Sequence, residues 1–112
     1  MIDRKEAVRK KLISNSRAII ANPKGLPVGI LTMSKLTSIY LSEIKELGLD
    51  LIVFNDAFDE IKDFSLGSER LHFNADLLVK QDKKLDQKLK NYRESILIKC
   101  FEIIKVLNRS DS

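Results

Sequence analysis

The 112-residue sequence is poor in several residue types that mark particular classes of protein. It has one cysteine, Cys100, which excludes an intramolecular disulfide and a cysteine-based metal cluster. It has one histidine, His72, and no paired-histidine or EF-hand spacing, so no common metal-binding motif is present. Four glycines and two prolines are few for a fold built from many tight turns. This scarcity favours helices over an all-β fold.

Long apolar runs and catalytic motifs are also missing. The first residues, MIDRKEAVRKK, carry charges of both signs, so we expect no signal peptide. The longest uncharged stretch, near residues 25–34, is too short to span a bilayer. There is no Gly-x-Ser-x-Gly nucleophile elbow and no phosphate-binding loop. We therefore predict a cytoplasmic protein that is not an enzyme and uses no metal or cofactor.

Two weak catalytic or metal signals remain. Arg70 and His72, with Glu69 alongside, form a possible acid–base group for RNA cleavage, although a structural role for Arg70 is the more ordinary reading. Asp56 and Glu60 stand four residues apart, as two carboxylate ligands of a cation do on a helix, but the same spacing is common on solvated helix faces. Neither signal outweighs the non-catalytic prediction.

The residues that are present predict one soluble helical domain over residues 1–112. Hydrophobic residues make up 44% and charged residues 32% of the chain, which is a globular composition. In the segment 3–21, Val8, Leu12 and Ile19 recur at helical spacing, and Pro23 should end that helix at Asn22.

A second helix is predicted over 28–47, with Gly48 as its C-terminal stop. Its expected buried side consists of Leu31, Leu36, Ile39, Ile44 and Leu47.

The stretch DLIVFNDAFDEIKDF, residues 50–64, is harder to assign. Residues 51–54 alone fit either a short buried strand or a helix. We favour a helix capped by Asp50, because Phe54, Phe58 and Ile61 then share one face. After a loop over 65–73, a long helix should run from the N-cap Asn74 to about Asn108, with its apolar C-terminal half the more deeply buried. The predicted fold is a small all-α bundle of about four helices with a long C-terminal helix.

The charges are segregated along the chain in a way that bears on partners. Residues 1–24 carry seven basic and two acidic residues, whereas residues 43–63 carry seven acidic and two basic ones. An acidic surface of this kind is complementary to a basic cleft in another protein, such as a site that holds phosphates. The residues we predict to bind such a partner are Asp56, Phe58, Asp59, Glu60, Asp63 and Phe64, the two phenylalanines as apolar anchors.

The basic N-terminal helix supports an alternative. Arg9, Lys10 and Lys11 there would neutralise phosphates in a small helical nucleic-acid-binding or regulatory protein. The lysines of residues 80–93 are interleaved with acids, which is typical of an ordinary solvated helix, and no aromatic stacking platform is evident from the sequence. The alternative therefore ranks second.

Four stretches together resemble a family of small helical bacterial proteins known only as a domain of unknown function (number 2489). They are SRAIIANPKGLPVGILTMSKL, LIVFNDAFDEI, SLGSER and KLDQKLKNYRESILIKCFEII. The positions that match the family pattern are Arg17, Gly25, Asp56, Gly67, Arg70, Arg93 and Cys100. The resemblance implies an all-helical fold and carries no established activity. Small bacterial proteins of this sort are often immunity proteins paired with toxins, so we expect a non-catalytic immunity protein whose acidic surface covers the active site of a cognate toxin, most simply a nuclease.

Overall fold

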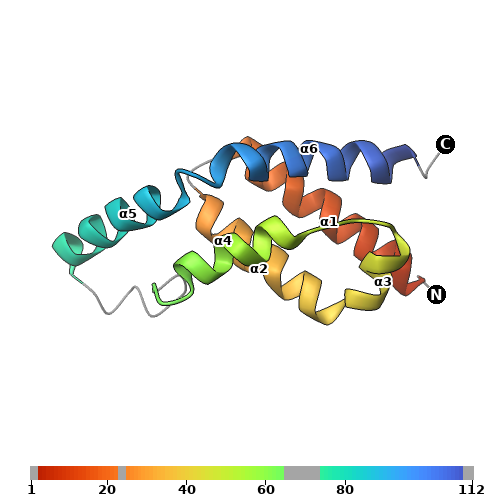
Figure 1. Cartoon of the computed structure of the whole chain (residues 1–112), viewed down its shortest axis with the longest axis horizontal. Coiled ribbons are helices and arrows are strands. Elements are labelled where there is room, and N and C mark those ends of the chain that lie inside the picture. The colour runs from red at the N-terminus through yellow and green to blue at the C-terminus, as the bar shows by residue number, and fades with distance from the viewer. Residues whose placement is uncertain (1–2, 23–24, 65–73, 110–112) are drawn as a thin grey trace.

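Six helices make up the part of the chain that the computed structural model describes, residues 3–22, 25–64 and 74–109 (Figure 1). They are α1 (Arg4–Ala21), α2 (Leu26–Ile39), α3 (Leu41–Glu46), α4 (Ile52–Ile61), α5 (Ala75–Leu89) and α6 (Arg93–Arg109). No strand occurs within these ranges, which confirms the all-α prediction, and six helices replace the predicted four. The bundle is elongated, with extents of 49 × 29 × 22 Å.

Helix α1 forms where its apolar spacing predicts and lies at the centre of the bundle, against α2 and α6 (Figure 1). The Asp3 side chain accepts a hydrogen bond from the Lys5 backbone N–H at 3.3 Å and so caps the first turn. The helix ends at Asn22, as predicted from Pro23. Val8, Leu12 and other residues of its apolar face are buried in the core.

The segment predicted as one helix over 28–47 is two helices. Helix α2 begins at Leu26, two residues earlier than predicted, and ends at Ile39, because Tyr40 leaves helical geometry with φ −116° and ψ 35°. The buried side of α2 runs through Met33, Leu36 and Thr37, which leaves Ile39 60% exposed, so the prediction that Ile39 is buried is wrong. Gly48 does end α3, with φ +74°, a conformation that glycine adopts without strain.

The segment that follows Gly48 is a helix, and the strand alternative for residues 51–54 is wrong. The Asp50 carboxylate accepts a hydrogen bond from the Ile52 backbone N–H at 3.0 Å, next to the first turn of α4. Phe54, Ala57 and Ile61 are fully buried, so three- and four-residue spacing fixes one face of α4 in the core.

The long helix predicted over 74–108 is also interrupted, between α5 and α6. The Asn74 side chain caps α5, accepting a hydrogen bond from the Leu77 N–H at 2.8 Å, as predicted. The chain then turns at Lys90–Tyr92 and changes direction (Figure 1). Helix α5 packs on α4 and buries only two of its residues, whereas α6 packs on α1. The residues of α6 that reach the core are Ile96, Cys100, Ile103 and Leu107.

A close approach of α1 and α2 holds the centre of the bundle together. A Cβ atom at Gly29 would lie 2.4 Å from the Cγ1 atom of Ile19, so only glycine fits at this crossing without movement. The Asn15 side-chain amide donates a hydrogen bond to the Gly29 carbonyl at 3.1 Å, which ties the same crossing with a polar contact. The two helices therefore have a tightly specified separation.

Candidate functional site

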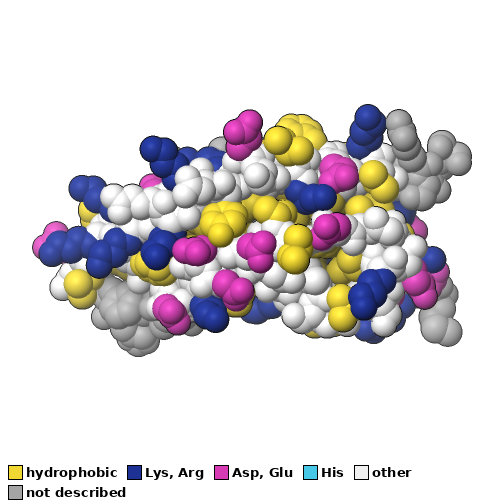
Figure 2. Space-filling view, in the orientation of Figure 1, with side chains coloured by type: hydrophobic (Ala, Val, Ile, Leu, Met, Phe, Trp, Pro, Cys, Tyr) yellow, Lys and Arg dark blue, Asp and Glu magenta, His cyan; other side chains and the backbone are white. Residues whose placement is uncertain are grey.

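Three of the four carboxylates predicted to bind a partner lie on one exposed face of α4, and the fourth, Asp63, lies in the turn that follows the helix. The four are Asp56, Asp59, Glu60 and Asp63, and we refer to them as the acidic face. Figure 2 shows acidic side chains gathered along α4 on the side turned to the viewer. The spacing of three and four residues places Asp56, Asp59 and Glu60 on a single stripe, and Asp63 follows it in the turn after the helix. Because the opposite side of α4 is buried, these three carboxylates are presented on a rigid element rather than on a loop.

Neighbouring lysines neutralise the acidic face only in part. Asp59 faces Lys62 at 3.8 Å, and Glu60 faces Lys88 of α5 at 3.8 Å. The two lysines and two acids of these ion pairs are each at least 42% exposed. Solvent therefore screens both pairs, and each pair contributes little to stability. These carboxylates therefore remain available to a stronger cationic partner.

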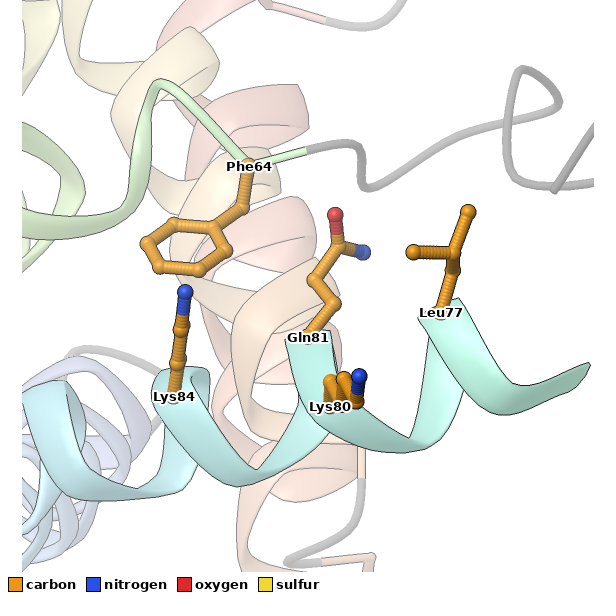
Figure 3. Close-up of a pocket in the computed structure, with 5 residues that line it drawn as sticks. All are labelled: Phe64, Leu77, Lys80, Gln81 and Lys84. Atoms are coloured by element: carbon orange, nitrogen blue, oxygen red, sulfur yellow. The ribbon is translucent and has the colours of Figure 1, made fainter.

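The two phenylalanines predicted as anchors are both half-buried. Phe58 packs against the hydrophobic core. Phe64 also packs against the core, and it borders an open depression of about 270 Å³ whose other described lining residues come from α5. Figure 3 shows its ring across from Gln81 and Lys84. Phe64 is the better placed of the two for contact with a partner, because it borders a surface recess at the end of the acidic face.

Sequence reasoning missed an apolar residue at the start of the same stripe. Ile52 is 62% exposed and stands four residues before Asp56, so it extends the acidic face by one turn. The four-residue spacing from Ile52 to Asp56 indicates that both lie on one side of a helix. The prediction for residues 51–54 is only a short buried strand or a helix, and it assigns Ile52 to no surface. An exposed isoleucine beside carboxylates supplies the apolar contact that a purely charged surface lacks.

The basic residues of the alternative reading differ in exposure. Arg9 is only 8% exposed, pairs with the Glu6 carboxylate through an Nε–Oε2 contact of 3.0 Å, and donates to the Leu107 carbonyl of α6 at 3.4 Å. Arg9 is therefore largely withdrawn from the surface, and the phosphate-binding role of the three residues stays a prediction. Lys10 and Lys11 are exposed, and Arg17 is exposed with them.

The remaining chemical candidates do not assemble into a reactive site within the described ranges. No group of three or more potential metal ligands occurs there. Cys100 is buried, and burial raises the pKa of its thiol to about 11, with the Ser16 hydroxyl acting in the opposite direction. The sequence-predicted group of Glu69, Arg70 and His72, like Gly67, lies outside the described residues. In the same ranges, no helix is long and apolar enough to cross a membrane.

Comparison with known proteins gives no relative from which to transfer a function. No protein-family model, no curated protein and no solved structure matches the chain. The resemblance to the domain-of-unknown-function family therefore stays a prediction, and function has to be inferred from the surfaces described above.

Proposed function

We propose that this chain is a non-catalytic immunity protein that binds a cognate bacterial toxin, a nuclease, and covers its basic active-site cleft with the acidic face of α4. A nuclease cleft that holds phosphates is electropositive, and clustered carboxylates occupy such a cleft in place of the substrate. Charge complementarity of this kind accelerates association and gives specificity.

The observation that carries the proposal is the grouping of four exposed carboxylates, three on one side of a helix whose other side is buried and one in the turn directly after it. Asp56, Asp59 and Glu60 span about 6 Å of helix at a rise of 1.5 Å per residue, and Asp63 follows three residues after Glu60. The charges are therefore dense, and the three on α4 are fixed relative to one another, which limits the entropy lost on binding. Ile52 in the first turn of α4 and Phe64, three residues after its end, add apolar surface at the two ends of this group.

The test is a binding measurement between this protein and the product of the neighbouring gene. The variant changes the four acids to isosteric amides, Asp56→Asn, Asp59→Asn, Glu60→Gln and Asp63→Asn. A single close charge pair in a tight interface contributes about 1.5 kcal/mol or more, which is about tenfold in affinity. Removal of four charges should therefore weaken the Kd at least about 100-fold by isothermal titration calorimetry.

A matched variant controls for net charge. It neutralises four exposed acids on other helices, namely Glu46, Asp76, Glu94 and Glu102. This control should bind the partner within about twofold of the wild-type Kd, because those acids lie on helices other than α4. Equal losses in the two variants would show that net charge, and not the acidic face of α4, governs the association.

A further inference from the structure

Helix α1 carries a second surface of opposite sign, made of two neighbouring depressions. One, of about 480 Å³, lies between α1 and α2 and is lined by Lys10, Lys11, Ser14, Asn15, Ala18, Thr32 and Leu36. The other, of about 430 Å³, lies between α1 and α6 and is lined by Arg9, Lys10, Ile13, Ser14, Arg17 and Asn108. Both are bordered by Lys10 and Ser14, so they are neighbours on the two sides of α1, and we refer to the two depressions together as the α1 groove.

Among the residues that the structure describes, the lining of the α1 groove is basic and includes no carboxylate. Lys10, Lys11 and Arg17 are exposed along it. The nearest acid of α1, Glu6, is engaged by Arg9. The α1 groove differs in this respect from α5, where lysines and aspartates alternate along the helix. A positively charged surface without neighbouring acids attracts polyanions.

Neutral donors in the α1 groove fit the same ligand. The hydroxyl groups of Ser14 and Thr32 and the side-chain amide of Asn108 line it beside the cations. Hydroxyl and amide side chains, together with lysine and arginine, are the usual partners of nucleic-acid phosphates. The groove thus offers both charge and directed hydrogen bonds to a phosphodiester backbone.

The wall of the α1 groove on α6 continues to an exposed aromatic residue. Helices α1 and α6 run antiparallel in register, with Arg9 beside Leu107 and Ser16 beside Cys100. In this register Phe101 lies level with Asn15, two residues before Arg17. Phe101 is 59% exposed, and it precedes the groove residue Asn108 by seven residues, which is two turns along the same face of α6.

We propose that the α1 groove binds single-stranded nucleic acid, with Lys10, Lys11 and Arg17 on successive phosphates and Phe101 stacking on a base. A cationic channel with an adjacent aromatic ring is the usual construction of such sites. Duplex DNA fits less well, because α1 is flanked by α2 and α6 and does not protrude as a helix must to enter the major groove (Figure 1). The site shares no residue with the acidic face of α4, so it is a separate binding activity.

The test is fluorescence anisotropy with a labelled single-stranded oligonucleotide, as DNA and as RNA, and nuclease-treated full-length protein. Three phosphate contacts predict a log–log salt slope of about −2. The affinity should therefore fall roughly 20-fold between about 50 and 200 mM salt. The double variant Lys10→Gln/Arg17→Gln should reduce the slope to about −0.7. Phe101→Ala should weaken binding about fivefold or more without changing the slope.

Controls make each outcome decisive. The variant Lys83→Gln/Lys90→Gln removes two exposed charges from α5 and its C-cap and should leave the affinity within about twofold. All substituted side chains are exposed, so unchanged circular dichroism and melting temperature are expected. The proposal is overturned if the wild type binds neither oligonucleotide at low salt, or if the α5 control loses as much affinity as the α1 variant. Binding to anionic lipid vesicles in place of nucleic acid would also overturn it.

Discussion

The crossing of α1 and α2 gives a sharp prediction about how the bundle is held together. In Gly29→Ala the new Cβ atom would stand 2.4 Å from Ile19 Cγ1 and 2.9 Å from Ile19 Cδ1. Carbon atoms in good contact lie about 3.5–4.0 Å apart, so the helices must separate or Ile19 must leave its rotamer. Ile19 is 2% exposed and has little space to move into.

The expected magnitude combines two opposing effects. Forcing a methyl group into a packed core costs about 1–3 kcal/mol. Replacing glycine by alanine within a helix returns up to about 1 kcal/mol through propensity. We therefore expect Gly29→Ala to lower the free energy of unfolding by about 1 kcal/mol, measured by urea denaturation followed by circular dichroism.

A double-mutant cycle separates the steric effect from helix propensity. Ile19→Ala removes both clashing atoms and should by itself destabilise the protein by about 2–5 kcal/mol. In that background Gly29→Ala should become stabilising, because the methyl group now fills space and the propensity gain remains. If Gly29→Ala has the same effect with and without Ile19, the clash does not control the helix separation and the reasoning is refuted.

Two further predictions concern ionisable groups. The Cys100 thiol, buried and with a pKa raised to about 11, should react with a disulfide reagent at least about 100-fold more slowly in the native protein than in urea, and comparable rates would contradict its burial. The hydrogen bond from Arg9 lowers the pKa of the Glu6 carboxyl below 4.5, so the pair stabilises the fold above that pH and the stabilisation is lost as the pH falls through the lowered value. Glu6→Gln should therefore be less stable than the wild type near neutral pH, with a difference that shrinks in acid; a pH-independent difference would exclude this linkage.

The sequence predicted those parts of the fold that local chemistry decides. Asn74 and Gly48 occupy the cap and stop positions predicted for them, and the side chain of Asn74 makes the capping contact. The acidic face was predictable because three- and four-residue spacing fixes which residues share a side of α4. In each of these cases the deciding contacts are a few residues apart in the chain.

The features that the sequence did not predict depend on contacts between distant segments. The apolar spacing of the last two helices continues from Leu89 through Ile96, so nothing in the pattern marks the turn at Lys90–Tyr92. Phe101 belongs to a stretch that is apolar nearly all round, and only the packing of α6 on α1 decides that it is exposed. Arg9 and Lys10 are adjacent basic residues, and nothing in the sequence marks one of them as buried. The contact of Arg9 with the Leu107 carbonyl, 98 residues away, removes Arg9 from the surface.

The presence of an acidic and a basic surface on different helices has a consequence for experiments on either one. Helix α2 packs against both α1 and α4, so the two surfaces belong to one rigid assembly while sharing no residue. Substitutions in the acidic face should leave binding at the α1 groove in place, and substitutions at Lys10 and Arg17 should leave the toxin affinity in place. Each binding activity is therefore a specificity control for the other.

The most direct test of the proposed function is the nuclease activity of the neighbouring gene product, titrated with this protein. If the acidic face covers the active site, activity should fall linearly to zero at one equivalent of the wild type. The variant with Asp56, Asp59, Glu60 and Asp63 neutralised should leave most of the activity at the same ratio. A complex that forms but leaves the partner fully active, or full inhibition by the neutralised variant, would contradict the proposed mode of binding.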